Sequence, residues 1–340
     1  MTSITRRRIL MAAGAGAITT IAGPGIRNAY AAEFTLKTGN NSAESHPQTV
    51  YMRKAAAGIA KDSNGRVELQ VFPNSQLGGD PAMLSQLRTG ALDFFTISGV
   101  NALSAMVPNA AITGVGFAFK SNEEVSAAMN GDLGKYIRAQ VRKAGLEVFD
   151  QYWDNGFRQI TSGSKPIKTA QDLDNFKIRV PPSALWTSLF QSLGASPTNI
   201  SFNEAYSALQ TKIVDGQENP LVIIEVSKLY EVQKYCALSN HMWDGFLCLA
   251  NRRSWGRLPP NLQEIVTHHI NSNALEQQKE VIRVNASLRS TLEGHGLAFN
   301  EVDTKGFRDK LSKSGFYAEW KKKFGDEAWG YLEKVTGNLA

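Results

Sequence analysis

Short stretches rich in β-branched and aromatic residues alternate with amphipathic patterns of helical period along the first third of the chain. Strands are predicted at residues 34–37, 67–71 and 92–97, and helices near residues 47–62 and 81–89. Such strand–helix–strand repetition is typical of a sheet covered by helices on its faces. The pattern therefore predicts an α/β fold with a mostly parallel sheet.

A second series of the same kind begins near Gly156. Its predicted elements are strands at 158–161 and 177–180 and helices near 183–193, 202–212 and 220–230. Because a chain of this length exceeds one typical core, we expect two α/β lobes joined by hinge strands. The predicted lobes are residues 32–155 with about 244–284, and residues 156–243 with about 285–340.

One long helix is predicted at residues 260–294. The segment contains neither proline nor glycine between Pro260 and Gly294, and its apolar residues recur at helical spacing. A break near residues 271–273 is the alternative. At 1.5 Å per residue the helix would reach about 50 Å, enough to cross both lobes.

The first 31 residues have the composition of an export signal. Arg6-Arg7-Arg8 precedes an apolar stretch from Met11 to Gly23, and Ala29-Tyr30-Ala31 is a small-x-small cleavage pattern. We expect a removable twin-arginine signal and a mature periplasmic protein beginning near Ala32. An uncleaved anchor is the alternative, but it would need roughly 20 apolar residues, and this stretch is shorter.

This segment also dominates the charge of the chain. The net charge of +6 reflects 37 basic and 31 acidic residues, and four of the arginines precede Ala32. The remainder has 33 basic and 31 acidic residues, or +2, and no basic cluster that indicates nucleic-acid binding. Cys236 and Cys248 are expected to be buried free thiols, with one disulfide as the alternative.

Two arginines stand where a predicted strand opens onto a loop. Arg179 follows an apolar strand residue and precedes Pro181-Pro182, which places its guanidinium near the carboxyl end of the strand, where α/β sheets bind ligands. Arg158 is the second candidate. A guanidinium grips a carboxylate through two parallel hydrogen bonds. The alternative for Arg179 is an ion pair with Asp172 or Asp174.

The segment Asp215-Gly216-Gln217-Glu218-Asn219-Pro220 adds a third candidate. Pro220 suits the first turn of the helix predicted to run to Tyr230, so Asn219 would lie at the entrance of that helix, where anions are attracted. Its amide would then donate to the same carboxylate. A simple helix cap is the alternative.

Catalytic patterns are absent from the sequence. His268 and His269 are adjacent on the long predicted helix and point about 100° apart, which does not suit joint metal binding. His46, His241 and His295 have no acidic or cysteine residue at ligand spacing, and no nucleophile elbow, phosphate loop or dinucleotide motif follows the signal. The sequence therefore predicts that the protein is not an enzyme and binds no metal and no cofactor.

Several segments form an ordered series. They are Asn155-Gly156-Phe157-Arg158-Gln159, Lys177-Ile178-Arg179-Val180-Pro181, Leu193-Gly194-Ala195-Ser196-Pro197, Phe202-Asn203-Glu204-Ala205-Tyr206, Val214-Asp215-Gly216-Gln217-Glu218-Asn219-Pro220 and, nearer the N-terminus, Phe72-Pro73-Asn74-Ser75-Gln76-Leu77-Gly78-Gly79-Asp80. In this order they resemble the solute receptors of the tripartite ATP-independent periplasmic (TRAP) transporters. The resemblance covers nearly the whole chain after the signal.

This resemblance implies a receptor with a periplasmic binding protein-like fold that holds a small organic acid anion between two lobes and delivers it to membrane permease subunits driven by an ion gradient. We expect the receptor to be monomeric. The resemblance also implies that Arg179 clamps the carboxylate, that Arg158 supports it and that Asn219 is the partner amide. In the sialic-acid receptors of the family an acidic residue follows the third strand. Ser98 stands at that position here, which argues against a sialic-acid ligand.

Further contacts are expected around this clamp. Asn41, Asp80 and Ser98 of the first lobe would cover the ligand when the lobes close. Aromatic residues near the predicted cleft suit an aromatic or apolar monocarboxylate, although a 2-oxo acid or a dicarboxylate also fits the clamp. The aromatic residues are Phe202, Trp243, Trp153, Trp186, Phe117 and Tyr206, of which Phe202 and Trp243 are the strongest candidates.

Two other functions are compatible with the same pocket. A ligand-binding partner of a membrane sensor kinase would share the fold and the clamp. A secreted enzyme that processes carboxylates would use the arginines to orient its substrate, but the chain lacks an acid/base constellation for this role.

Overall fold

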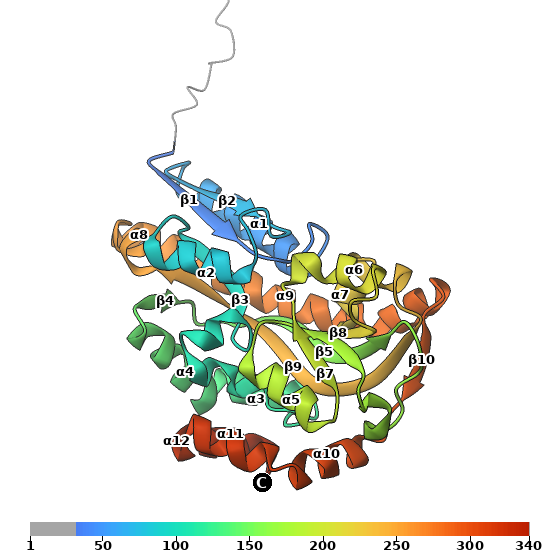
Figure 1. The fold of residues 1–340 in the computed structure, drawn as a ribbon. Coiled ribbons are helices and arrows are strands. Elements are labelled where there is room, and N and C mark those ends of the chain that lie inside the picture. Colours follow the sequence, from blue (N-terminus) through green and yellow to red (C-terminus); the bar gives the residue numbers. More distant parts are fainter. Residues whose placement is uncertain (1–31, 340) are drawn as a thin grey trace, which may run out of the picture. The chain divides into compact units, whose positions relative to one another are not determined.

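Ten strands form one mixed sheet in the computed structural model, which describes residues 32–339 (Figure 1). The predicted export signal at residues 1–31 lies outside this range. The strands are β1 (Phe34–Gly39), β2 (Val67–Phe72), β3 (Phe94–Ser98), β4 (Leu146–Val148), β5 (Trp153–Ser162), β6 (Lys177–Val180), β7 (Ser196–Asn199), β8 (Gly216–Pro220), β9 (Tyr235–Asn251) and β10 (Ala298–Glu301). Eight of them follow the order β2-β1-β3-β9-β5-β8-β6-β7, and β4 and β10 pair with β9.

The two ends of the sheet are parallel and its middle is antiparallel. At one end β1 lies between β2 and β3, and at the other β6 lies between β7 and β8, all with parallel pairing. The long strands β5 and β9 run antiparallel to each other between these ends, and each continues into the pairing of a parallel unit. This arrangement confirms the predicted fold class of two α/β lobes joined by shared strands. The proposed residue boundaries of the lobes stay a prediction.

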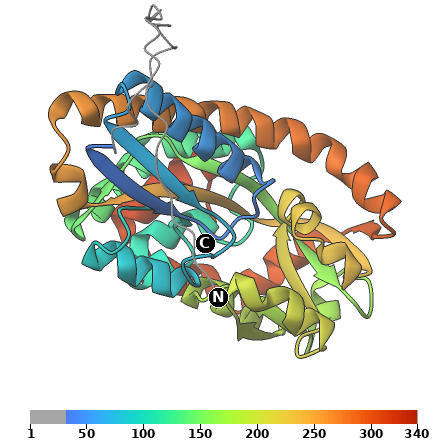
Figure 2. The ribbon, with the colours of Figure 1, turned by 90° about the horizontal axis from the view of Figure 1, so that it is seen from above.

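Helices cover both faces of the sheet (Figures 1 and 2). They are α1 (Pro47–Asp62), α2 (Asp80–Thr89), α3 (Asn122–Asn130), α4 (Asp132–Lys143), α5 (Ala184–Ser192), α6 (Phe202–Gln210), α7 (Leu221–Val226), α8 (Arg252–Gly256), α9 (Pro260–Gly294), α10 (Thr304–Lys313), α11 (Phe316–Phe324) and α12 (Asp326–Thr336). Among residues 32–339, no helix combines the length and the apolar character that crossing a membrane requires.

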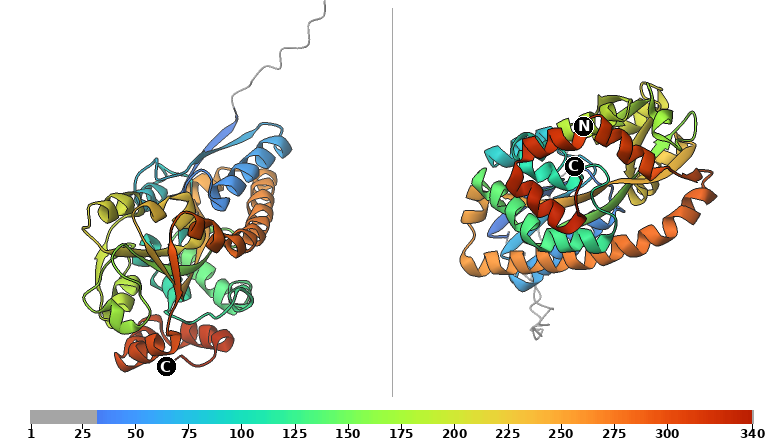
Figure 3. Two further views of the ribbon diagram at one scale, coloured as in Figure 1. Left: turned by 90° about the vertical axis from the view of Figure 1, so that its right-hand side faces the viewer. Right: turned by 90° about the horizontal axis from the view of Figure 1, so that it is seen from below.

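The predicted long helix is confirmed, and it is not broken near residues 271–273. Its N-terminal half buries Leu262, Val266 and Ile270 in a cluster with α1 and β1, whereas its C-terminal half buries Leu288 and Leu292 beside α6 and α7. Figure 2 and the right-hand view of Figure 3 show α9 (orange) running along one side of the sheet past both parallel units. One rigid element therefore packs on both lobes.

Two details near the cleft differ from the prediction. The strand around Arg158 already begins at Trp153, so Arg158 lies inside β5 and not where a strand opens onto a loop. Irregular pairing on both sides of Arg158 bends this strand, and such bulges redirect side chains. The helix predicted at 220–230 is only α7, because Lys228 adopts a left-handed conformation (φ 53°) after it. Asn219 is therefore the penultimate residue of β8, directly before Pro220, which ends the strand and caps α7.

Both cysteines are free and buried, as expected. Cys236 and Cys248 lie on β9 among apolar neighbours of two different clusters. Burial raises the pKa of both thiols, to about 12 for Cys248.

The bulge in β5 depends on a glycine. Gly156 has φ +97°, and a Cβ at this position would lie 2.8 Å from Asn285 Nδ2 on α9. We expect Gly156→Ala to lower the free energy of unfolding by about 1–3 kcal/mol, measured by urea denaturation. Gly330 in α12 serves as the control, because a Cβ added there would meet no atom within 4 Å. Gly330→Ala should raise stability by roughly 0.5–1 kcal/mol, and equal stability of the two variants would contradict the role of Gly156.

Candidate functional site

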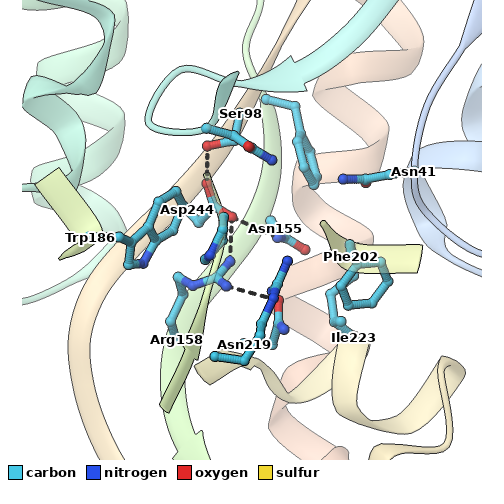
Figure 4. Close-up of a pocket in the computed structure, with 13 residues that line it drawn as sticks. Asn41, Ser98, Asn155, Arg158, Trp186, Phe202, Asn219, Ile223 and Asp244 are labelled. Carbon is cyan, nitrogen blue, oxygen red and sulfur yellow. Dashed lines mark hydrogen bonds and ion pairs between the residues drawn. The ribbon is translucent and has the colours of Figure 1, made fainter. Parts of the chain in front are cut away.

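A cavity lies where the carboxyl ends of β1, β3, β6 and β8 approach the long strands β5 and β9 (Figure 4). One wall carries Asn41, Ser98, Asn101 and Phe246, and the opposite wall carries Arg158, Arg179, Trp186, Phe202, Asn219 and Ile223. Asn155, Asp244 and Pro181 complete the lining. The wall with both arginines is cationic, whereas the facing wall has only uncharged side chains.

Arg158 is occupied by acceptors of the protein itself. Its guanidinium donates to both carboxylate oxygens and, at 2.7 Å, to the carbonyl oxygen of Glu218. It also donates to Asp244 Oδ2 at 2.6 Å and to Asn219 Oδ1 at 3.0 Å, and it lies 4.8 Å from the centre of the Trp186 ring. Since Arg158 is 3% exposed, one buried cation is shared by two buried anions. Figure 4 shows this connection from Ser98 through Asp244 to Asn219.

Glu218 is held in its ionised form. Burial alone would raise the pKa of this carboxyl, but the charge of Arg158 and the hydrogen bond from His241 outweigh burial and lower the pKa to about 2. His241 Nε2 lies 3.1 Å from Glu218 Oε2, and its Nδ1 lies 2.8 Å from Ser239 Oγ. Because a carboxylate only accepts hydrogen bonds, the imidazole proton is on Nε2. Burial lowers the pKa of His241, which keeps the ring neutral.

Arg179 has a different environment. It is 1% exposed, yet within residues 32–339 only its Nε has a hydrogen-bond partner, the carbonyl oxygen of Ile200 at 2.7 Å. The two terminal nitrogens, Nη1 and Nη2, have no acceptor in the described part of the chain, and the residue lines the cavity. Burial lowers the pKa of Arg179 to about 10, so the group is charged at neutral pH. The Phe202 ring lies 5.7 Å from its guanidinium carbon.

The facing wall is organised by two buried carboxyl groups. Asp80 Oδ2 accepts hydrogen bonds from Asn41 Nδ2 at 2.8 Å and from Asn101 Nδ2 at 2.7 Å. Asp244 Oδ1 accepts from Ser98 Oγ at 2.6 Å. Both carboxyl groups thus fix the orientation of the neutral side chains at the cavity surface.

Seven of the ten residues predicted to contact the ligand line this cavity. They are Asn41, Ser98, Arg158, Arg179, Trp186, Phe202 and Asn219. Asp80 lies directly behind Asn41 and Asn101. Ligand contact by all of these residues stays a prediction.

The two remaining tryptophans do not reach the cavity, and the expectation that they lie at its edge is corrected here. Trp243 precedes Asp244 on β9, and neighbouring strand residues point to opposite faces, so its ring enters the core and its Nε1 donates to Asp154 at 2.8 Å. Trp153 is fully buried in the core beneath α9. Phe117 is also a core residue, and Tyr206 donates to Glu231 outside the cavity.

Several residues of the site were not found from the sequence. Glu218 and Asp244 neutralise Arg158, and Asn101 and Asn155 add amides to the lining. One signal was present for Asp244, because it is a single acidic residue within the otherwise apolar run from Met242 to Ala250. A buried acid in a strand requires a partner.

Comparisons with known proteins agree on one family. Residues 38–322 match the family described as "Bacterial extracellular solute-binding protein, family 7". An uncharacterized protein y4mM of Sinorhizobium fredii is 35% identical over 308 residues, and the match covers 89% of this chain but only 56% of that longer protein. The chain thus spans about half the length of this relative.

Two solved structures share the fold. A TRAP periplasmic solute-binding protein from Sulfurospirillum deleyianum with bound succinate is 27% identical, with a TM-score of 0.85 over 90% of this chain and 99% of that one. The sugar acid binding protein DctPAm from Advenella mimigardefordensis, in complex with galactonate, is 28% identical, with a TM-score of 0.85 over 90% and 98% of the two chains.

A buried histidine near the cavity should make stability depend on pH. His46 Nδ1 accepts a hydrogen bond from Gln48 N and caps α1, and burial lowers the pKa of this residue to about 3. Below its unfolded pKa of 6.5, the unfolded chain binds a proton that the folded chain excludes. The free energy of unfolding therefore decreases as the pH falls from 6.5 towards 3, by up to about 1.4 kcal/mol per pH unit, because protonation of His46 favours the unfolded chain.

His46→Asn keeps a cap acceptor but removes the titrating group. The free energy of unfolding of this variant, measured by denaturant titration at several pH values, should decrease less steeply than that of the wild type as the pH falls from 6.5 towards 3. Parallel curves for the two proteins would refute the assignment.

Proposed function

Because the chain belongs to family 7 of the bacterial extracellular solute-binding proteins, the receptors of TRAP transporters, we propose that it captures a small organic acid anion by its carboxylate between the two lobes and delivers it to a TRAP permease. Members of this family are binding proteins and not enzymes. The proposal includes export through the twin-arginine pathway to the periplasm and action as a monomer. The ligand would be one acid of the class seen in the two solved relatives, which hold succinate and galactonate.

One observation carries this proposal, the incomplete hydrogen bonding of Arg179. A buried charge without a partner is costly, and proteins normally pair it. Nη1 and Nη2 of Arg179 form the parallel donor edge that fits the two oxygens of a carboxylate. A bound carboxylate would accept hydrogen bonds from both terminal nitrogens of Arg179. The neighbouring phenyl ring of Phe202 would shield this ion pair from water.

Arg158 supports the clamp without being its main ligand contact. Its charge is already balanced by Glu218 and Asp244, so it offers little further attraction to an anion. Its bond to Asn219 Oδ1 instead orients that amide. One proton of Asn219 Nδ2 is used by Gln217, and the second is left for a ligand oxygen.

The proposed mechanism is closure of the lobes around the anion. The carboxylate docks on Arg179, which lies on β6 in one parallel unit, and the rest of the ligand meets Asn41 and Ser98 from the other unit. A ligand shifts an open–closed equilibrium only if it binds the closed form more tightly, and contacts on both walls provide this difference. The permease would recognise the closed receptor.

The unpaired state of Arg179 leads to an unusual prediction. Arg179→Met should leave the thermal midpoint of the ligand-free protein unchanged or raised, because the variant no longer buries a guanidinium whose two terminal nitrogens lack hydrogen-bond acceptors. The same variant should bind its acid at least about thirty-fold more weakly, since losing one side of a buried charged pair costs roughly 2–5 kcal/mol. A thermal-shift screen over mono- and dicarboxylates would identify the acid, and calorimetric titration would measure the affinity.

Arg158→Met is the matched control. It leaves Glu218 and Asp244 as unpaired buried anions and should lower the free energy of unfolding by about 3–5 kcal/mol. Affinity of wild-type strength in Arg179→Met would refute the proposed clamp. A large loss of stability in that variant would instead assign Arg179 a structural role.

A further inference from the structure

The wall that faces Arg179 presents hydrogen-bond acceptors. Ser98 Oγ donates its proton to Asp244 and accepts from Val100 N at 3.2 Å, so towards a ligand it can act only through its remaining acceptor position. Asn41 directs its Nδ2 towards Asp80, and its Oδ1 accepts from no group within residues 32–339. Both residues line the cavity. A ligand hydroxyl can use both the acceptor oxygens of this wall and the second amide protons of Asn41 and Asn101, whereas a second carboxylate, which only accepts, can use the protons alone.

Asp80 determines this polarity. Its Oδ2 can only accept from a neighbouring amide, so Asn41 and Asn101 must both turn their Nδ2 atoms towards it. Asn101 is fixed from the other side as well, because its Oδ1 accepts from Ala102 N at 2.7 Å. Asp80 is 3% exposed, and its Oδ1 has no partner among the described residues. Burial raises the pKa of this carboxyl. Even in its protonated form, with the proton on Oδ1, its Oδ2 would still accept the hydrogen bonds from Asn41 and Asn101.

The cationic side chains of the cavity also favour a ligand with a single carboxylate. Arg158 is neutralised by two carboxylates, and Arg179 would be occupied by the first carboxylate of the ligand. No other arginine, lysine or protonated histidine lines the cavity within residues 32–339. A second carboxylate would enter a closed site without a cation to pair with, which is unfavourable.

We propose that Asp80 is a positioning residue that makes the site select hydroxylated monocarboxylates over dicarboxylates, by engaging Nδ2 of Asn41 and leaving its Oδ1 to accept from a ligand hydroxyl. This inference rests on the proposed function, because it takes the carboxylate on Arg179 as its starting point. It narrows the ligand to a hydroxy acid of the aldonate type. It also argues against the apolar, aromatic and dicarboxylate ligands that the clamp alone allows.

Acids matched in chain length test the proposal. Erythronate, succinate and butyrate each have four carbons and carry, besides one carboxylate, three hydroxyls, a second carboxylate or nothing. Galactonate, adipate and hexanoate repeat the comparison at six carbons. Calorimetric titration of the wild-type protein should give the tightest binding for the hydroxylated acid of each set, by at least tenfold over the dicarboxylate.

Variants of Asp80 then test its role. Asp80→Ala removes the acceptor and should weaken binding of the preferred hydroxy acid at least tenfold, while the unsubstituted acid of equal length changes less than threefold. Asp80→Asn keeps an acceptor oxygen and should retain most of the preference. Asp93→Asn is the control, because Asp93 is another buried carboxylate of the same parallel unit that accepts from Lys37 N and does not line the cavity. It should leave the ratio between acids unchanged.

The possible failures are distinct. Tighter binding of the dicarboxylate by the wild type would overturn the selectivity and leave carboxylate capture intact. An equal loss for all acids in Asp80→Ala, or the same loss in Asp80→Asn, would show that the orientation of Asn41 is not the cause. Binding of only an aromatic or apolar acid in the thermal-shift screen would overturn this inference and leave carboxylate capture intact, whereas a screen in which no acid binds would overturn the proposed function as well.

Discussion

The ion triad of Arg158, Glu218 and Asp244 is the constraint on which the cavity depends. Arg158 and Asp244 come from β5 and β9, the long strands between the two parallel units, and Glu218 comes from β8 of the second unit. Burying three charges is costly, and good geometry with complete hydrogen bonding is needed to offset this cost. The triad meets this condition, because every oxygen of the two carboxylates accepts at least one bond from Arg158, His241, Ser98 or Asn155. The triad thereby connects the long strands β5 and β9 to the residues that line the cavity.

The two arginines differ in how completely the protein itself satisfies their hydrogen-bond donors. Arg158 has its acceptors within the protein and serves as a scaffold. Arg179 lies in the same cavity, and its terminal nitrogens have no acceptor among the described residues. If Arg179 clamps the ligand as proposed, the stability that the free protein loses by burying this side chain is recovered when the carboxylate binds. Trp186 and Phe202 flank the two guanidinium groups and limit the water that would weaken both interactions.

The sequence predicted much of this arrangement, and its failures have physical reasons. Periodicity identified the α/β units and α9, because those signals are local. Arg179 was located because Val180-Pro181-Pro182 ends a strand at the edge where ligands bind. The partners of Arg158 were not found, because Glu218 and Asp244 lie 60 and 86 residues away along the chain and meet it only through strand pairing. Trp243 was misplaced because the bulged register of β5 and β9 decides which face each residue takes.

The two shielded thiols have a practical consequence for studying how the receptor moves. Cys236 and Cys248 are buried, and their elevated pKa values leave almost no reactive thiolate at neutral pH. Maleimide dyes or nitroxide spin labels would therefore attach selectively to cysteines introduced at exposed positions. A label on α2 and another on α6 would report lobe separation in the otherwise native sequence, without first replacing any residue of β9.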